Sequence, residues 1–367
     1  RALHQLARAW LDVCKPRVIG ITGTVGKTTA KELAAATLRT RIATHWSQGN
    51  FNSREGLPLA VMSLRNGDRV SVLEMGMDSP GEIVQLCETA RPEVGVVLNI
   101  GLTHVSKLGS IEAIAQEKLS LARWLPETGT AILNADDTRI AAALGSIRAR
   151  TITFGASPSA TLQLRDTVDR GLEGTRFTVT YRGETAESCS PLPGQHVLPA
   201  ALSAIGICLA LGMSLAEAAD ALAAADPQGR LRQRTSASGA TILDDRYNAS
   251  PASVAGALRL LGTLDAGKRY ALLGVMAELG DHEETEHRAI GALAASTCDA
   301  LYAVGDPCRA MVESALAAGL ADAHWFTSKE DAAAALAARL RSGDHVLVKA
   351  SRSQAFETVI PILEGAT

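Results

Sequence analysis

The stretch that decides the fold is GITGTVGKTT, residues 20–29, which joins an apolar run at 17–22 to a helical pattern at 28–40. Its glycines let the backbone curl so that N–H groups and the helix N-terminus face phosphate oxygens. Lys27 can neutralise phosphate charge, and the Thr28 hydroxyl can ligate Mg²⁺. Ile21 stands where the strict G-x-x-x-x-G-K-[ST] pattern has its first glycine. We interpret the stretch as a nucleotide phosphate loop; the alternative is a glycine-rich turn that binds nothing.

The pattern around this loop indicates a parallel sheet. After an amphipathic N-terminal helix over 1–15, apolar runs at 70–75, 94–100 and 130–133 alternate with helical patterns at 81–90 and 110–125. Such alternation is typical of a parallel sheet wrapped by helices. Three short alternating stretches follow at 151–154, 161–164 and 176–181, and we expect them to be antiparallel strands at the edge of this domain. Helices at 198–211 and 215–224 then complete a first domain over 1–225.

The rest of the chain predicts a second domain over 226–367, which begins at the chain-breaking DPQG of 226–229. Strands are expected at 241–244, 270–275, 300–304, 324–327 and 345–349, with helices between them. This is a second doubly wound, Rossmann-like unit. The fold class is therefore α/β: a central domain with a phosphate loop, a mostly parallel sheet and antiparallel edge strands, followed by a C-terminal α/β domain.

Composition excludes several classes of protein. The 367 residues are 47 % hydrophobic and 20 % charged, and no apolar run reaches the roughly 18–20 residues of a membrane span. The start of the chain lacks a signal-peptide pattern, so we expect a cytoplasmic protein. Six cysteines without a C-x-x-C pair argue against a zinc ribbon and a disulfide framework. A net charge of −3 gives no electrostatic footprint for nucleic acid.

Ordered motifs extend the pattern over nearly the whole chain. They are TGTVGKTT (22–29), GNFN (49–52), GLP (56–58), LEMGM (73–77), GEI (81–83), NIGLTH (99–104), LGS (108–110), Lys118, LNADD (133–137), DDRYNASP (244–251), MAELG (276–280) and VKASRS (348–353). This series resembles the Mur ligase family, and within it the MurF branch. So many matches in order are far more specific than the loop alone.

The resemblance implies an ATP-dependent amide-bond ligase that works through an acyl phosphate. This branch adds D-Ala-D-Ala to UDP-MurNAc-tripeptide in peptidoglycan precursor synthesis. Joining a carboxylate to an amine needs a better leaving group than oxide, and negative charge accumulates during the reaction. Mg²⁺ ions and cationic side chains are suited to stabilise that charge. We expect small peptide or amino-acid substrates and a monomer.

The resemblance also assigns roles in the first domain. Lys27, Glu74, His104 and Lys118 would be catalytic; Thr28, Glu74, His104 and a carbamylated Lys118 would hold metal. The alternative for Lys118 is a lysine on a helix surface without a function. Taken without its motif, His104 would be interpreted as an ordinary structural histidine. Asn50 and Asn52 would contact substrate. The expected ATP contacts in this domain are Thr22, Gly23, Thr24, Val25, Gly26, Lys27, Thr28, Thr29 and Asn134.

In the second domain, the resemblance places Arg230 at the ATP phosphates, Asp245 at the ribose hydroxyls and Asn248 beside them. Lys349 and Arg352 suit a substrate carboxylate or phosphate, with Arg capable of bidentate contact. The alternative for that pair is a solvated strand end. Because ATP groups come from both domains, the resemblance implies that the site forms when the domains close.

Two departures limit the resemblance. The family usually shows G-x-H-N-x-x-N, but here Gly194-Gln195-His196 is followed by Val197 and then Ala200. Adenine would then be held by other groups, such as Asn134 and backbone amides. The chain also begins just before the phosphate loop, without the N-terminal domain that grips the uridine nucleotide. That is expected either of a trimmed chain or of a ligase that never had the domain.

Other functions stay open at this stage. A stand-alone ligase of the same kind could join an amino acid or dipeptide to a different carboxylate, such as a cofactor or natural-product acid. A nucleotide-binding subunit of an amidotransferase complex is a second alternative, although such subunits typically carry a four-cysteine zinc site that is missing here. A catalytically dead scaffold would not need the metal-binding residues.

Overall fold

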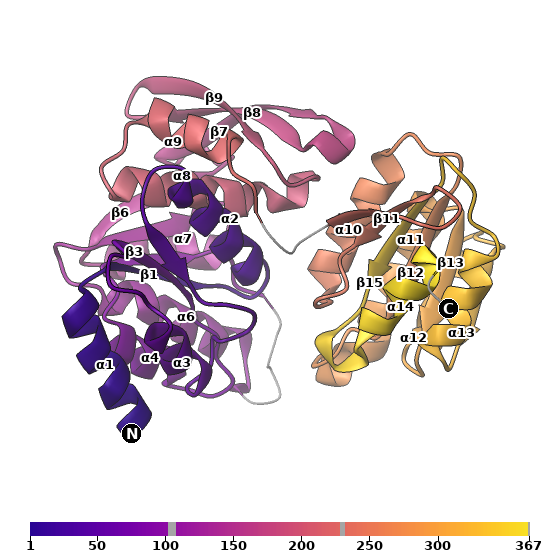
Figure 1. Cartoon of the computed structure of the whole chain (residues 1–367), viewed down its shortest axis with the longest axis horizontal. Coiled ribbons are helices and arrows are strands. Elements are labelled where there is room, and N and C mark those ends of the chain that lie inside the picture. Colours follow the sequence, from indigo (N-terminus) through magenta and orange to yellow (C-terminus); the bar gives the residue numbers. More distant parts are fainter. Residues whose placement is uncertain (102–107, 228–231, 366–367) are drawn as a thin grey trace. The chain divides into compact units, whose positions relative to one another are not determined.

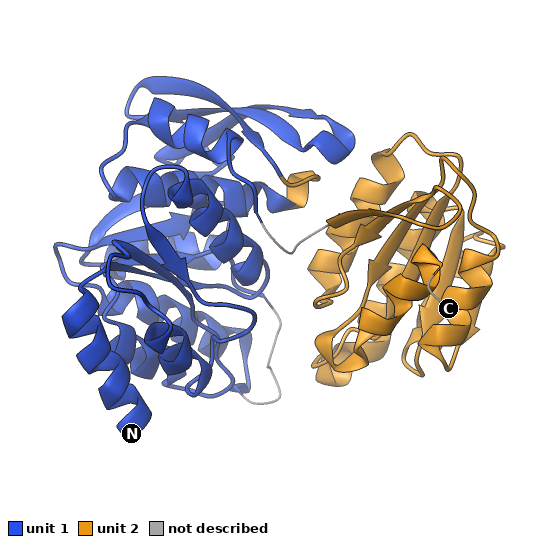
Figure 2. Cartoon of the chain, viewed as in Figure 1, with its two compact units in different colours: residues 1–191, 197–228 blue, residues 192–196, 229–367 orange. Residues whose placement is uncertain are grey.

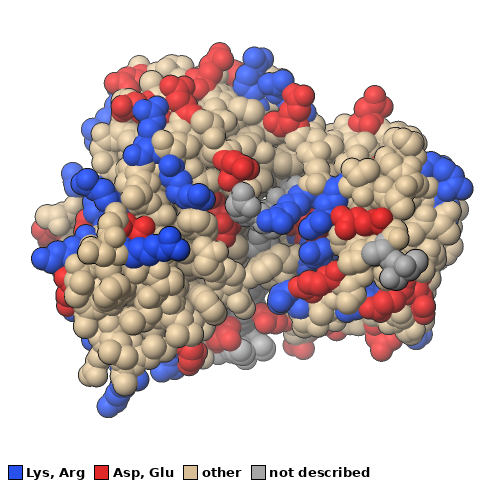
Figure 3. Space-filling model, in the orientation of Figure 1, with Lys and Arg blue, Asp and Glu red and all other residues tan. Residues whose placement is uncertain are grey.

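The computed structural model describes residues 1–101, 108–227 and 232–365. The chain divides into two compact units (Figure 2), residues 1–191 with 197–228 and residues 192–196 with 229–367. Within the described residues, no helix is long and apolar enough to cross a membrane. On the face drawn in Figure 3, basic and acidic side chains are interspersed on each unit rather than gathered by sign.

Unit 1 is built on a nine-stranded sheet in the order β2-β3-β1-β4-β5-β6-β7-β8-β9. The first seven strands in that order run parallel, with β1 between β3 and β4. The strands are β1 (Arg17–Thr22), β2 (Thr44–Trp46), β3 (Val70–Glu74), β4 (Val94–Val97), β5 (Thr130–Asn134), β6 (Arg150–Gly155), β7 (Leu162–Asp169), β8 (Thr175–Tyr181) and β9 (Glu184–Ser190).

The expectation of three antiparallel edge strands was partly wrong. β6 pairs parallel with β5, and β7 pairs parallel with β6; antiparallel pairing begins only between β7 and β8. The chain reaches β6 through helix α7 (Thr138–Ala143), and such a crossover delivers a parallel strand. The connection between β6 and β7 is too short for a full crossover, so they pair only at Phe154↔Leu162 and Gly155↔Gln163.

Helices cover both faces of this sheet (Figure 1). One core joins the sheet to α2 (Lys27–Arg39), α8 (Leu198–Ala210) and α9 (Leu215–Ala223). The other core joins it to α1 (Ala2–Cys14), α3 (Gly56–Met62), α4 (Glu82–Ala90) and α6 (Ile111–Trp124). Along β1, Ile19 and Ile21 face the first core and Val18 the second, as the period of two in a strand requires.

Two glycines bring α6 close to the centre of the sheet. Gly20 of β1 and Gly95 of β4 are register partners. A Cβ on Gly20 would lie 2.9 Å from the Met75 sulfur and 3.1 Å from Leu121 of α6, and one on Gly95 would lie 3.1 Å from Leu121. Only glycine therefore allows this approach of α6, the helix that carries Lys118.

Unit 2 holds a six-stranded sheet in the order β10-β11-β15-β12-β13-β14, parallel except for β10. Its strands are β10 (Arg232–Thr235), β11 (Thr241–Asp244), β12 (Arg269–Gly274), β13 (Ala300–Val304), β14 (Ala323–Phe326) and β15 (His345–Lys349). Its helices are α10 (Pro251–Thr263), α11 (Glu283–Thr297), α12 (Cys308–Ala317), α13 (Lys329–Ala337) and α14 (Val359–Glu364). The five strands expected here are present; β10 was not foreseen.

Candidate active site

The loop of residues 22–29 connects β1 to α2, as the sequence predicted. Gly26 caps α2 with a φ of 84°, a left-handed conformation that glycine adopts at no steric cost. The Lys27 ammonium donates to the carbonyls of Gly23 (2.8 Å) and Thr24 (3.1 Å). The first N–H groups of α2 have no partner within the helix, so they and Lys27 form a concave, electropositive end suited to phosphate.

Asn99 fixes the shape of this loop, a role that the sequence did not reveal. Its side-chain oxygen accepts from the N–H groups of Thr24 (3.0 Å) and Val25 (2.8 Å), and its Nδ2 donates to the Val25 carbonyl (2.9 Å). The Thr24 hydroxyl in turn exchanges hydrogen bonds with the backbone of Gly101. The sequence offered two signals, since Asn99 opens the NIGLTH motif and follows β4, the strand that pairs with β1, but neither indicates a contact with the loop.

Glu74 lies at the end of β3, level with Ile21 of β1. It is 2 % exposed, and its Oε1 accepts from the Asn52 side chain at 2.7 Å. Within the described residues, its buried Oε2 has no hydrogen-bond partner. Gly76 permits this arrangement, because a Cβ there would lie 3.1 Å from the Asn52 side chain. The structure thus brings Asn52 to Glu74, whereas Asn50 is exposed.

Lys118 is buried, so its alternative assignment as a helix-surface lysine was wrong. Its side chain on α6 is 1 % exposed, and its ammonium donates to the Gly23 carbonyl at 2.9 Å. Burial lowers the pKa of Lys118 well below its ordinary value; the nearby charge of Lys27 lowers it further and Glu117 opposes. Lys27 and Lys118 therefore both donate to the Gly23 carbonyl of the phosphate loop. Lys118 lies 95 residues from Gly23 in the sequence.

The oxygen atoms beside the loop fit a hard divalent cation. Two buried oxygens, Oε2 of Glu74 and Oγ1 of Thr22, have no hydrogen-bond partner within the described part of the chain. Carboxylate and hydroxyl oxygens are the ligands that Mg²⁺ prefers. No cluster of three His, Cys, Asp or Glu suited to a metal occurs among the described residues. An ion here would therefore complete its coordination with phosphate oxygens and water, as Mg²⁺ usually does.

Three predicted residues, two in the first domain and Arg230 in the second, are not placed at the phosphate loop by the described structure. The Asn134 amide is buried and already used, because Nδ2 donates to the Leu98 carbonyl at 2.8 Å and Oδ1 accepts from the Asp136 N–H at 2.9 Å. Its contact with adenine stays a prediction. His104 and Arg230 lie outside the described residues.

Unit 2 gathers a second polar cluster at the carboxyl ends of β11 and β15. The Lys349 side chain, 2 % exposed, forms an ion pair with Asp245 and donates to the Asn248 carbonyl at 2.8 Å. The His196 ring packs on α10, where a Cβ on Gly256 would lie 2.7 Å from it. Burial lowers the pKa of His196; Asp245 raises that pKa and Lys349 lowers it.

Lys349 and Arg352, predicted as a pair, have different surroundings. The alternative interpretation, a solvated strand end, was wrong for Lys349, which is buried. The Arg352 side chain is 59 % exposed and forms an ion pair with Glu357. Arg352 also lies over the Tyr247 ring, 5.9 Å from its centroid. An anion could therefore reach Arg352 directly, but at Lys349 it would share the ammonium with Asp245.

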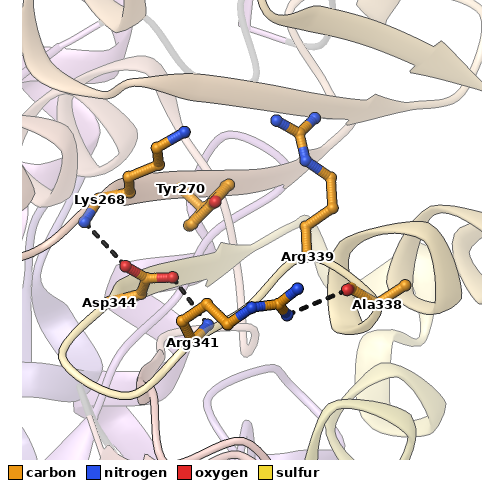
Figure 4. Close-up of a pocket in the computed structure, with 6 residues that line it drawn as sticks. All are labelled: Lys268, Tyr270, Ala338, Arg339, Arg341 and Asp344. Atoms are coloured by element: carbon orange, nitrogen blue, oxygen red, sulfur yellow. Dashed lines mark hydrogen bonds between the residues drawn. The ribbon is translucent and has the colours of Figure 1, made fainter.

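Unit 2 also holds a cavity of about 360 Å³ whose lining includes none of these residues. Figure 4 draws six residues that line it. The cavity opens at the amino ends of β12 and β15, where Asp344 accepts from the backbone N–H groups of Lys268 and Arg341. The cluster of Asp245 and Lys349 lies at the carboxyl ends, where open α/β sheets bind ligands. The cavity is therefore not part of the candidate site.

Comparison with known proteins gives consistent matches over both units. The family model for the Mur ligase middle domain matches residues 21–208, and that for the Mur ligase glutamate ligase domain matches 229–352. The UDP-N-acetylmuramoyl-tripeptide–D-alanyl-D-alanine ligase of Bacillus subtilis is 37 % identical over 363 residues, which are 98 % of this chain and 78 % of that protein.

Solved structures of similar proteins share the fold. The crystal structure of MurF from Acinetobacter baumannii superposes with a TM-score of 0.88 at 27 % identity and covers 99 % of this chain and 80 % of that one. MurF ligase from Thermotoga maritima, solved in complex with ADP, gives a TM-score of 0.86 at 27 % identity and covers 100 % and 83 % of the two chains.

Proposed function

The chain belongs to the Mur ligase family, and from that premise we propose that it joins D-alanyl-D-alanine to UDP-N-acetylmuramoyl-tripeptide with hydrolysis of ATP to ADP and phosphate. The names of relatives at 31–37 % identity support the substrates. The ADP in the Thermotoga maritima structure supports the nucleotide. The observation that carries the chemistry is the convergence of Lys27 and Lys118 on the Gly23 carbonyl, with Glu74 on the neighbouring strand.

The reaction has two steps in this proposal. The tripeptide carboxylate attacks the γ-phosphorus of ATP, and ADP leaves with the electron pair of the broken P–O bond. The amine of D-alanyl-D-alanine then adds to the acyl carbon and loses a proton, and collapse of the tetrahedral intermediate expels phosphate. Lys27 and the N–H groups at the start of α2 offset negative charge in the first step, because they are preorganised around the phosphate.

Magnesium, when bound, would act as a Lewis acid and template for the phosphates. Thr28 and Glu74 would hold one ion and His104 with Lys118 would help hold a second. The Glu74 oxygen without a hydrogen-bond partner in the described residues supports this assignment. We further propose that Lys118 is carbamylated. Carbamylation requires a neutral amine, and burial lowers the Lys118 pKa in the direction that supplies one.

The second half of the site is proposed from the family alone. We propose residues 1–225 as the ATP-binding domain and 226–367 as the domain that supplies Arg230 to the phosphates, Asp245 to the ribose and Asn248 beside them. Asn50, Asn52, Lys349 and Arg352 would contact the substrates. The enzyme would work as a monomer in the cytoplasm, where ATP and nucleotide-linked precursors are available.

Mass spectrometry of the product tests the proposal directly. The protein is incubated with ATP, Mg²⁺, UDP-muramoyl tripeptide and D-alanyl-D-alanine, and the expected product is the pentapeptide with one ADP released per bond. ADP release that requires a different acid or amine would replace these substrates and keep the ligase chemistry.

The Lys27→Ala variant tests the nucleotide site. We expect it to lose turnover by roughly 10³-fold or more, because a cation that offsets phosphoryl-transfer charge is removed. Calorimetry should show ATP binding weakened in parallel. Unchanged ADP formation in this variant would contradict the phosphate-loop assignment.

A further inference from the structure

Helix α2 carries a buried lysine, Lys31, one turn beyond Lys27. The Lys31 side chain is fully buried, and its ammonium lies 3.0 Å from Oε1 of Glu32 and 4.0 Å from Oε2 of Glu74. It also donates to the Gly49 carbonyl at 3.2 Å. Burial of an ammonium group is costly unless the charge is paired, so the position of Lys31 depends on these carboxylate and carbonyl contacts.

Lys31 and Asn52 both hold Glu74, and Lys31 also contacts the segment that leads to Asn52. Gly49 lies in the turn that the Phe51 N–H closes on the Gln48 carbonyl, three residues before Asn52. The Asn52 side chain donates to Oε1 of Glu74 at 2.7 Å. The other carboxylate oxygen, Oε2, has no hydrogen-bond partner in the part of the chain that the structure describes, and Lys31 is its ion-pair neighbour there. Glu32 shares the same ammonium, since its Oε1 lies 3.0 Å from Lys31, but its Oε2 also accepts from the Trp46 ring N–H at 3.0 Å and its side chain is 14 % exposed. Glu74 is the more deeply buried of the two carboxylates and depends more on the charge of Lys31.

We propose that Lys31 is the resident counter-ion of Glu74, which compensates the buried carboxylate in the metal-free protein and shares it with the metal in the loaded protein. Lys31 is a positioning residue, since it reaches the site through Glu74 and Gly49. The metal part of this inference rests on the proposed function. The pairing of Lys31 with Glu74 in the free protein does not.

Charge compensation has a measurable consequence. Without Lys31, the buried Glu74 carboxylate loses its cation while Asn52 still holds it in place. The metal-free protein should therefore be destabilised. A divalent cation should stabilise the variant without Lys31 more than it stabilises the unsubstituted protein. In the variant the cation supplies the missing positive charge, and it is not repelled by the Lys31 ammonium beside the same carboxylate.

Thermal unfolding of Lys31→Met, with Met close to Lys in length, tests this. Without ligand, we expect the Tm to fall by roughly 5–15 °C, the effect of breaking a buried ion pair in a unit of this size. Addition of ADP with Mg²⁺, compared with ADP alone, should raise the Tm further in Lys31→Met than in the unsubstituted protein. The matched control is Glu32→Gln, which leaves Lys31 opposite Glu74 and should show the magnesium shift of the unsubstituted protein.

A double-variant cycle decides the pairing without any metal. If Lys31 and Glu74 form a pair, Lys31→Met/Glu74→Gln should have a higher Tm than Lys31→Met, because the buried Glu74 charge that lost its cation is removed, whereas the loss at Glu32 is the same in both variants. This comparison also serves if Lys31→Met alone fails to fold. Additive losses in the cycle would overturn the counter-ion assignment.

The outcomes separate this inference from the proposed function. Suppose that Mg²⁺ raises the Tm of the unsubstituted protein and raises the Tm of Lys31→Met by the same amount or less. That result would overturn the shared-carboxylate inference and leave the ligase proposal standing. Absence of any magnesium shift in the unsubstituted protein overturns the metal assignment of Glu74, and with it the metal part of this inference. The double-variant cycle still decides whether Lys31 is the counter-ion of the free protein.

Discussion

Each unit buries a lysine near the carboxyl ends of its parallel strands, but the two lysines have different partners. In unit 1, the Lys118 ammonium donates to a neutral carbonyl, that of Gly23. In unit 2, the Lys349 ammonium faces the carboxylate of Asp245. A hydrogen bond to a neutral carbonyl offsets little of the free energy lost when an ammonium is buried, whereas an ion pair with a carboxylate offsets much of it.

The difference indicates two uses of the same side chain. Burial against a carbonyl lowers the pKa of Lys118 and favours a neutral amine that can react or be modified. Pairing with a carboxylate favours a fixed charge, so Lys349 is suited to hold the loop after β11 through Asp245 and Asn248. We therefore expect variants of Lys118 to affect chemistry first and variants of Lys349 to affect stability first.

Within this comparison of Lys118 with unit 2, the largest effect should come from Lys118→Ala. We expect kcat/KM to fall by roughly 10³-fold, about 4 kcal/mol, because the proposed carbamylated Lys118 would be a carboxylate-like metal ligand at the reaction centre, and the variant removes it. Short carboxylic acids added to the assay should restore part of the rate by filling the space. Lys27→Ala is the control, since its lost group is a cation and acids should not rescue it. A lack of rescue, with no carbamate density at Lys118 in a crystal structure, would remove the chemical half of the comparison.

The next effect is on folding, in Lys349→Met. This variant leaves Asp245 buried without its cation, and we expect unit 2 to lose about 3 kcal/mol of unfolding free energy, as measured by urea denaturation. Lys349→Met/Asp245→Asn should recover part of that loss. Lys268→Met, which changes an exposed lysine of the same unit, should cost less than about 0.5 kcal/mol. Unchanged stability with lost activity in Lys349→Met would instead support its predicted role at the substrate.

The sequence predicted the elements that local chemistry determines. Strand bounds at 17–22, 241–244, 300–304 and 345–349 agree with the structure, because each apolar run is ended by turn residues or charge. The pairing of β6 and β7 was wrong, since alternation reports how a strand is buried and not the direction of its neighbour. The short β2 and α3 were missed because three to seven residues carry too little periodicity.

The site was predictable as a set of residues but not as a set of contacts. Lys27, Glu74 and Lys118 were named from motifs, and the predicted functions of these residues stay predictions. The Asn99 bonds to the loop span 74 and 75 residues, and Lys31 of α2 reaches Glu74 at the end of β3. No local pattern encodes such distances. The burial of Lys118 likewise depends on Gly20 and Gly95, which the sequence presents only as glycines in strands.

The smallest effect should be the pH dependence that His196 gives to unit 2. Burial, opposed by Asp245 and reinforced by Lys349, lowers the pKa of His196 from its ordinary value of 6.5. Below that value the unfolded chain binds a proton that the folded unit does not, so unfolding free energy should fall as the pH drops, until the lowered pKa is reached. The slope is at most about 1.4 kcal/mol per pH unit.

Urea denaturation of unit 2 between neutral and mildly acidic pH measures this slope in the unsubstituted protein and in His196→Gln. The difference between the two slopes should have the sign just given, and His282→Gln, which changes an exposed histidine of the same unit, should keep the original slope. If His196→Gln leaves the slope unchanged, the ring is not buried as a neutral base. If the difference has the opposite sign, Asp245 attracts the proton more strongly than burial and Lys349 oppose it. In that case Lys349 does not neutralise Asp245, and the contrast with Lys118 is lost.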